Sequence, residues 1–374
     1  MKRRTFLKRS MVGVGGIAGM THAGLATAGS NTLNDAKTEP GVGSKEAVGR
    51  PVRITSISFA NGLPLDGIVK YVDQAGAAHV DVIILPEVCR GQKDNTAEGL
   101  NGQTITAMAA LAKKHNTYIV CPIDRRSGTS RLNTAVLLDR SGKVACLYNK
   151  VFPYWSEYNL HPAADVGEEA PIYHADFGRM GFAICFDANF PEVWKRLADQ
   201  GAELVIWPSA YSAGASLQAH AINHHYYIVS STQTRDCLVY DITGEKLHYS
   251  KSEHVNVATV SLDLDRGVYH QNFNMPGRDK LLKEHAEDVE QEKWMELEQW
   301  FVLKAKRPGV SARQLAKQYG LEDLRHYLDR SRRSIDERRG WVFEAKVLFP
   351  NMDRASLKSL SHRTNLAGLT GKNG

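Results

Sequence analysis

Three side chains in the middle of the chain form a set that can carry out acyl transfer through a thiol. Each follows a short run rich in valine, isoleucine and leucine: Glu87 follows residues 80–85, Lys150 follows 143–148 and Cys185 follows 179–184. Runs of this length predict buried strands, and ligand sites in α/β folds gather beyond the carboxyl ends of strands. We therefore expect a base, an oxyanion partner and a nucleophile at one rim.

Each of these residues taken alone has an ordinary structural interpretation. A single cysteine after an apolar strand is usually a small buried hydrophobe, Glu87 alone is a solvated acid at a strand end, and Lys150 alone is a surface lysine. Their combination favours a catalytic role over these structural ones. The thiol also lies where a strand meets a helix beginning near Pro191, and a helix N-terminus favours the thiolate.

The sequence around these residues resembles the carbon–nitrogen hydrolase (nitrilase) superfamily, nearest to its amidase and ureidopropionase-like members. The segments that carry the resemblance are Leu85-Pro86-Glu87, Tyr148-Asn149-Lys150, 181–187, 190–192 and 205–210. The resemblance implies that Glu87 is the general base, Lys150 stabilises the oxyanion and Cys185 is the nucleophile. It further implies substrate-binding roles for Glu157, Ser209 and Phe186, the last through its backbone N–H.

The resemblance implies hydrolysis of a non-peptide carbon–nitrogen bond, in an amide or an N-carbamoyl group, through a thioester on Cys185. It implies no cofactor and no metal, a small-molecule substrate and a homo-oligomer. The alternatives are a true nitrilase and a non-catalytic binding protein. The presence of Glu87, Lys150 and Cys185 together counts against the non-catalytic alternative. Asn189 stands where many members have arginine, and residues 220–224 differ from the usual helix, so the substrate is left open.

Two histidines and the cysteines allow other chemistry. His220 and His224 lie four residues apart on a predicted helix, but no third ligand is evident, so we expect structural histidines and no metal. The five cysteines are odd in number and show no paired spacing. The sequence therefore assigns no disulfide; those outside the triad are Cys89, Cys121, Cys146 and Cys237.

The patterns along residues 51–275 predict an α/β fold. Strands are expected near 53–59, 117–121 and 204–207 and at the runs above, hairpins at 133–148 and 237–249, and helices at 65–80, 104–115 and 191–200. Strands that alternate with helices and hairpins indicate a mixed sheet with helices on its faces. The family resemblance implies a four-layer α-β-β-α sandwich.

The N-terminus has the features of an export signal. Arg3-Arg4-Thr5-Phe6-Leu7-Lys8 resembles a twin-arginine motif, an apolar stretch follows, and Ala26-Thr27-Ala28 offers a cleavage site. We expect a signal peptide over 1–28, a linker over 29–50 and a mature protein that is periplasmic or secreted. The apolar stretch is too short for a stable membrane anchor.

The net charge of +6 is concentrated at the two ends of the chain. Residues 1–28 hold five basic and no acidic residues, and residues 276–374 hold twenty basic and fifteen acidic residues. The domain between them is therefore acidic, which gives no electrostatic case for nucleic acid.

Residues 276–374 are predicted to form a C-terminal helical extension. Trp294, Leu297 and Phe301 have helical spacing, and residues 310–321 have the pattern of a helix-turn-helix. Because acids and bases nearly cancel there, we expect a docking or oligomer helix pair and not a DNA-binding unit. The extension is expected to pack on the catalytic domain or a neighbouring subunit and to wall the substrate entrance.

Overall fold

The computed structural model describes residues 47–340. The predicted signal peptide lies outside the described residues, as do most of the predicted linker and residues 341–374. Within the described part of the chain, no helix combines the length and the apolar character that a membrane span needs.

Two six-stranded mixed sheets form the main domain. In spatial order, the first sheet contains β12 (Val255–Asp263), β1 (Pro51–Phe59), β2 (Val82–Ile84), β3 (Tyr118–Ser127), β4 (Ser130–Leu138) and β5 (Val144–Asn149). The second contains β11 (Lys246–Lys251), β10 (Asp236–Tyr240), β9 (Tyr227–Thr232), β8 (Leu204–Ser209), β7 (Gly178–Phe182) and β6 (Ile172–Ala175). Each sheet has three parallel central strands, β1-β2-β3 and β7-β8-β9.

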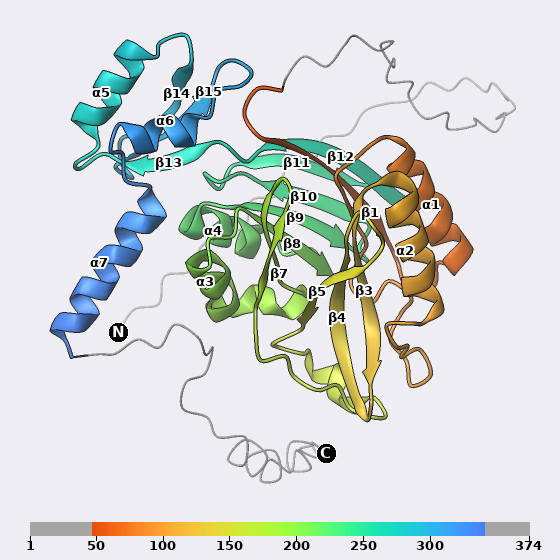
Figure 1. Ribbon diagram of the computed structural model, residues 1–374. Helices are drawn as coiled ribbons and strands as arrows, with labels where there is room; N and C mark the ends of the chain where they lie inside the picture. Colours follow the sequence, from red (N-terminus) through yellow and green to blue (C-terminus); the bar gives the residue numbers. More distant parts are fainter. Residues whose placement is uncertain (1–46, 341–374) are drawn as a thin grey trace, which may run out of the picture. The chain divides into compact units, whose positions relative to one another are not determined.

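Two pairs of helices cover the outer faces of the sheets (Figure 1). The helices α1 (Leu65–Ala77) and α2 (Gln103–His115) pack on the first sheet, and α3 (Pro191–Asp199) and α4 (Gly214–His224) pack on the second. Buried residues of both sheets, with those of α3 and α4, form one large hydrophobic cluster. The expected four-layer α-β-β-α sandwich and its α/β class are thus confirmed, and most strands and helices lie within a few residues of their predicted ends.

The C-terminal extension, predicted as helical, contains strands as well as helices in its described part. A three-stranded sheet, ordered β13-β15-β14, stands beside three helices. Their bounds are β13 (Gly267–His270), β14 (Val289–Met295), β15 (Trp300–Ala305), α5 (Met275–Glu284), α6 (Ala312–Gln318) and α7 (Leu324–Arg338). We call this part, residues 267–338, the C-terminal unit.

The expected apolar stripe of the extension belongs to a hairpin. Trp294 on β14 is the cross-strand partner of Phe301 on β15, and Leu297 is 92% exposed in the turn between them. Spacing alone cannot separate a helix from two short strands around a turn. Phe301 joins a separate small core, so the unit has its own hydrophobic centre.

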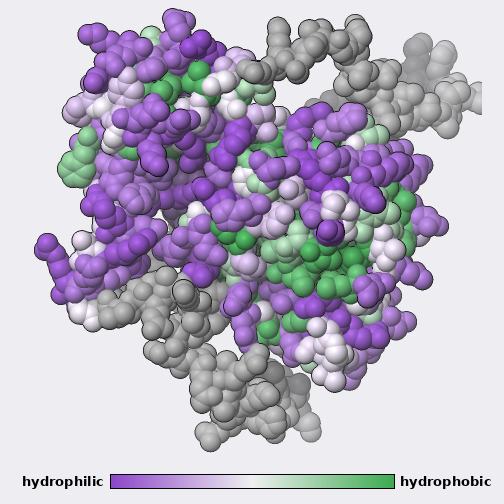
Figure 2. All heavy atoms as spheres, in the orientation of Figure 1, coloured by the Kyte–Doolittle hydropathy of each residue, from purple (hydrophilic) through white to green (hydrophobic). Residues whose placement is uncertain are grey.

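The C-terminal unit is joined to the sandwich by apolar and polar contacts. Its buried residues Val268, Trp300, Val302 and Leu324 belong to the large hydrophobic cluster of the sandwich. Arg325 on α7 donates a hydrogen bond of 2.6 Å to the carbonyl of Ala202, and Lys195 on α3 lies 3.4 Å from Asp329. On the face seen in Figure 2, this unit is mainly hydrophilic, while apolar residues gather over the strands of the sandwich. Of the two expected packing partners, the catalytic domain and a neighbouring subunit, the described contacts are with the former.

Candidate active site

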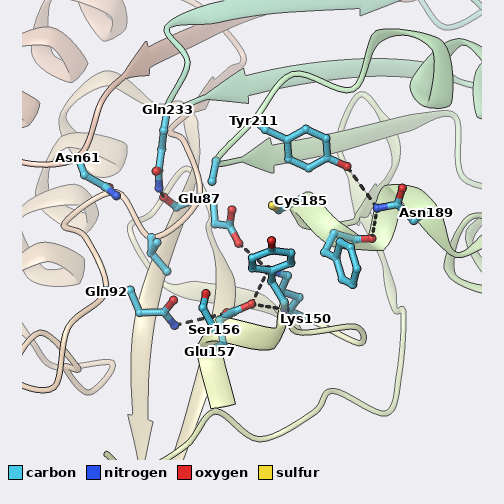
Figure 3. Close-up of a pocket in the computed structure, with 14 residues that line it drawn as sticks. Asn61, Glu87, Gln92, Lys150, Ser156, Glu157, Cys185, Asn189, Tyr211 and Gln233 are labelled. Carbon is cyan, nitrogen blue, oxygen red and sulfur yellow. Dashed lines mark hydrogen bonds and ion pairs between the residues drawn. The ribbon is translucent and has the colours of Figure 1, made fainter. Parts of the chain in front are cut away.

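The three predicted residues meet at the carboxyl ends of β2, β5 and β7 (Figure 3). The ammonium group of Lys150 lies 2.8 Å from Oε1 of Glu87. The thiol of Cys185 lies close enough to both for their charges to act on its pKa. The second oxygen of Glu87, Oε2, is buried and has no hydrogen-bond partner among the described residues. A base and a nucleophile therefore face each other beside a cation.

The backbone is unusual beside two of these residues. Cys185 opens a 3₁₀ turn, Cys185–Asn189, with φ at +47°, and Val88, directly after Glu87, has φ at +38°. A positive φ is unfavourable for any side chain with a Cβ and most of all for a β-branched one. Such conformations persist where the surrounding structure fixes them, often at functional sites. Gln233 supports Glu87 from its other side, since its amide donates to the Glu87 carbonyl at 2.8 Å.

A close backbone contact fixes the segment that carries Lys150. The N–H of Lys150 donates to the carbonyl of Asn133, which extends the pairing of β4 with β5. The N–H of Gly167 donates to the carbonyl of Lys150 at 2.8 Å. A Cβ at position 167 would lie 2.1 Å from the oxygen of Asn149, so this approach requires glycine.

The surroundings favour charged lysine and neutral cysteine. Burial would lower the pKa of Lys150, but the charges of Glu87, Cys185 and Glu157 outweigh it and raise the pKa. Burial raises the pKa of the Cys185 thiol, and the Glu87 carboxylate raises it further against the opposing effect of Lys150. The expected thiolate is therefore not favoured in the free protein, and the thiol needs a base at the moment of attack.

A second glutamate completes the charged cluster. Oε2 of Glu157 lies 2.6 Å from Nζ of Lys150, and one amide nitrogen of Asn133 donates to both carboxylates, at 2.8 Å to Glu87 and 2.9 Å to Glu157. We call Glu87, Lys150, Glu157 and Asn133 the catalytic cluster. Asn133 is not among the residues that the sequence predicts for the site. Its one available signal was an asparagine within a predicted strand, where this residue is disfavoured.

The buried carboxylate of Asp187 links the nucleophile turn to the lysine segment. It accepts hydrogen bonds from the hydroxyl of Tyr148 at 2.6 Å and from the N–H groups of Phe152 at 2.9 Å and Ile184 at 2.8 Å. Burial raises the pKa of Asp187 to about 6 despite these hydrogen bonds. One side chain thus holds together the segments on which Cys185 and Lys150 stand.

The charged members of the cluster, Glu87, Lys150 and Glu157, and the thiol of Cys185 line a cavity of about 570 Å³. Its other lining residues are Asn61, Val88, Gln92, Tyr154, Ser156, Phe186, Asn189, Ala210, Tyr211 and Gln233. The backbone N–H of Phe186 belongs to the first turn of the 3₁₀ helix, where N–H groups lack partners within the helix. Ser209 does not line the cavity: it is buried, and its hydroxyl bonds to the backbone of Tyr211. No described residue of the C-terminal unit lines the cavity, contrary to the expectation for the extension.

The histidine and cysteine residues considered for a metal site or a disulfide have neither in the described part of the chain. His220 stacks on Trp194 at 4.2 Å and its Nε2 lies 2.9 Å from the carbonyl oxygen of Ala188. No group of three or more potential metal ligands is found among residues 47–340. All five cysteines are free, and the nearest two sulfurs, those of Cys89 and Cys121, are 3.9 Å apart, well beyond the S–S bond length of about 2.05 Å.

The chain belongs to the carbon-nitrogen hydrolase family, whose model matches residues 64–268. The chain is 30% identical over 208 residues to the nitrilase and fragile histidine triad fusion protein NitFhit of Drosophila melanogaster, covering 50% of this chain and 44% of that protein. It is 33% identical over 117 residues to deaminated glutathione amidase of Synechocystis, covering 27% and 43%. It is also 29% identical over 161 residues to beta-ureidopropionase of Arabidopsis thaliana, covering 39% of each. The chain spans about half the length, or less, of these curated relatives.

Solved structures share the fold. An amidase from Nesterenkonia sp. superposes with a TM-score of 0.52 at 21% identity, over 59% of this chain and 93% of that one. Saccharomyces cerevisiae Nit3, a member of the nitrilase superfamily, superposes with a TM-score of 0.51 at 17% identity, over 58% and 91%. A mutant of the Nesterenkonia amidase shows covalent addition of the acetamide moiety of fluoroacetamide at its active site cysteine. At these identities the comparison establishes a common fold.

Proposed function

We propose that this protein is a thiol-dependent hydrolase that cleaves an amide or N-carbamoyl group through a thioester on Cys185. The observation that carries the proposal is the meeting of a buried carboxylate, ammonium group and thiol around one cavity. Membership of the carbon-nitrogen hydrolase family supports it. The names of similar proteins, which include an amidase and a ureidopropionase, support the choice of amide and N-carbamoyl groups.

In the first half-reaction Glu87 accepts the Cys185 proton as sulfur attacks the substrate carbonyl carbon. The raised pKa of the thiol makes this general-base step necessary. Lys150 stays positively charged, and its ammonium group with the N–H of Phe186 stabilises the tetrahedral oxyanion. Collapse of the intermediate breaks the carbon–nitrogen bond, and Glu87 passes the proton to the departing nitrogen. The products of this step are a free amine or ammonia and the thioester.

In the second half-reaction Glu87 takes a proton from water, which attacks the thioester carbon. The same two donors stabilise the second oxyanion. The carbon–sulfur bond then breaks, the sulfur recovers the proton from Glu87, and the carboxylic acid is released. Glu157 and Asn133 hold Lys150 and Glu87 in place through both steps.

A screen for ammonia release tests the proposed function. The full-length chain and its Cys185→Ala variant are compared on primary amides, N-carbamoyl compounds and nitriles. We expect release from amides or N-carbamoyl compounds, and a loss of at least about 10⁴-fold in the variant, because no other group forms the thioester. Cys237→Ala is the matched control, since this buried cysteine does not line the cavity. Release from nitriles alone, or an equally active Cys185→Ala variant, contradicts the proposal.

We further propose that the protein is exported through the twin-arginine route and works as a soluble homo-oligomer. The support is Arg3-Arg4 with the following apolar and small-residue segments, and the family resemblance for the oligomer. Changing both arginines to lysine should retain the protein in the cytoplasm, and light scattering should give a mass above that of one chain. Export that does not depend on the arginines, or a monomeric mass, contradicts the respective proposal.

A further inference from the structure

The cavity holds more negative than positive charge. Among the described residues that line it, the charged ones are Glu87, Glu157 and Lys150. Two carboxylates and one ammonium group give a formal charge of −1. Nζ of Lys150 already lies 2.8 Å and 2.6 Å from the two carboxylates, and its side chain is 1% exposed. The cluster therefore has no positive charge left over for a substrate.

Other buried cations near these strands are engaged elsewhere. Arg131 on β4 is paired with Asp124, to which its Nε donates at 2.9 Å. Arg125 on β3 donates to the side chains of Thr134 at 3.1 Å and Asn149 at 3.2 Å. Neither guanidinium group lines the cavity. A carboxylate brought close to Cys185 would thus lose its water and meet two acids, and no described residue of the cavity wall supplies a free cation, which is unfavourable.

The remainder of the cavity wall is neutral, and part of it is aromatic (Figure 3). The rings of Tyr154 and Phe186 meet edge to face at 5.2 Å, and Phe186 meets Phe190 in the same way at 5.3 Å. Polar neutral groups are supplied by Asn61, Gln92, Ser156, Asn189, Tyr211 and Gln233. Such a wall offers apolar area with a few orienting hydrogen bonds, which is the usual composition of a site for uncharged small molecules.

We propose that the cavity takes uncharged amides with an aromatic or apolar substituent and rejects substrates that carry a carboxylate near the scissile bond. This inference rests on the proposed function and narrows its substrate class. N-carbamoyl amino acids, which carry such a carboxylate, are therefore poor substrates. A substrate with a carboxylate binds poorly because its charge is desolvated and left unpaired. An uncharged amide with an aromatic substituent binds better because its ring contacts the aromatic wall.

Matched substrates test the inference on the full-length chain. The probes are 3-phenylpropionamide, methyl succinamate, succinamate and N-carbamoyl-β-alanine, with ammonia release as the measurement. Methyl succinamate and succinamate differ in whether the remote carboxyl group is esterified or charged. We expect kcat/KM to be at least about tenfold higher for the ester than for the anion, and highest for 3-phenylpropionamide.

An added cation tests the electrostatic cause. Asn189 lines the cavity, is exposed, and bonds to the Phe186 carbonyl at 3.1 Å. Asn189→Arg should raise the ratio of kcat/KM for succinamate to kcat/KM for 3-phenylpropionamide about tenfold. Asn101→Arg is the matched control, because Asn101 is exposed and does not line the cavity; it should leave the ratio unchanged.

The outcomes separate this inference from the function on which it rests. Hydrolysis of succinamate as fast as that of its ester, with loss of activity in Cys185→Ala, retains the proposed function and overturns the substrate class. An equal ratio in wild type and Asn189→Arg overturns the electrostatic explanation. Release from N-carbamoyl-β-alanine but from no neutral amide overturns the substrate class alone. Failure to release ammonia through Cys185 from any amide or N-carbamoyl compound overturns both proposals.

Discussion

Two buried clusters in this protein place one basic side chain between two acids, and they differ in what surrounds them. In the catalytic cluster, Lys150 stands between Glu87 and Glu157. At the junction with the C-terminal unit, Arg266 stands between Asp241, at the end of β10, and Glu292 on β14. Both clusters border a cavity, of about 570 Å³ and about 470 Å³ respectively. Charge composition alone therefore does not distinguish them.

The differences lie in the cation and its neighbours. Arg266 presents a planar fork that bonds to both oxygens of Asp241 and to the hydroxyl of Tyr227, and a guanidinium group held in this way is fixed. Lys150 is a compact point charge that can turn toward a developing oxyanion, and Cys185 stands beside it. No cysteine lines the second cavity. The proposed function thus assigns reactivity to the cluster that has a neighbouring thiol and an unpartnered oxygen on Glu87.

Removing the cation of each cluster should give the largest contrast. Lys150→Gln leaves two buried acids and no oxyanion partner, so we expect turnover to fall at least about 10³-fold and the free energy of unfolding to fall by about 3–5 kcal/mol. Arg266→Gln should lower stability similarly, while kcat changes less than about twofold. Amide hydrolysis and urea unfolding measure the two effects.

Lys150→Arg keeps the positive charge, so its activity can be measured even if Lys150→Gln does not fold. This variant should remain folded yet lose about 10²-fold in kcat, because a guanidinium group cannot take the position of the ammonium group. Equal losses of activity in the Lys150 and Arg266 variants would remove the distinction between the two clusters.

The next contrast is the pH dependence of stability. Burial raises the pKa of Asp187 from the usual 3.8 to about 6, against the opposing effects of its hydrogen bonds and of Lys150. The folded protein therefore binds one more proton than the unfolded chain between these pH values, so stability falls as pH rises from about 4 to 6. The loss is at most about 3 kcal/mol.

Asp187→Asn should flatten this part of the profile, because the substituted side chain does not titrate. Urea unfolding of both proteins at several pH values between 4 and 7 provides the measurement. A wild-type profile that rises over this range by as much as that of the variant would show that Asp187 does not titrate as described.

The smallest contrast concerns the second acid of each cluster. Glu157→Gln keeps a hydrogen bond to Lys150 but removes its charge, and we expect kcat to fall about tenfold because the lysine is held less firmly. Glu292→Gln, the corresponding change on β14, should alter kcat less than about twofold. Steady-state kinetics on a neutral amide separate them; equal effects would mean that Glu157 has no positioning role.

The sequence predicts the residues of the catalytic cluster better than those at the junction with the C-terminal unit. Glu87, Lys150 and Cys185 follow apolar runs, and ligand sites in α/β folds gather beyond the carboxyl ends of strands. Here β2 and β5 belong to one sheet and β7 to the other. Asn133 could not be found in this way, because its contact with both acids depends on the pairing of β4 with β5. Ser209 followed a strand too, yet it points into the structure and holds the backbone of Tyr211.

The C-terminal unit shows where periodicity fails. Trp294 and Phe301 are seven residues apart, a distance that fits two turns of a helix and also a pair of partners across a hairpin. Gln299, with φ at +59°, lies in the turn between them, and no glycine marks it in the sequence. Short apolar runs of this kind acquire their structure from tertiary packing, here the pairing of β15 with β13 and β14.

The central claim is that Cys185 carries the acyl group during turnover, and trapping the acyl-enzyme tests it most directly. The full-length chain is mixed with 3-phenylpropionamide and quenched in acid within one turnover, and its peptides are analysed by mass spectrometry. We expect the phenylpropionyl group on the peptide containing Cys185, and none in Cys185→Ala. Turnover without an adduct on Cys185, or with the adduct on another cysteine, would contradict the account.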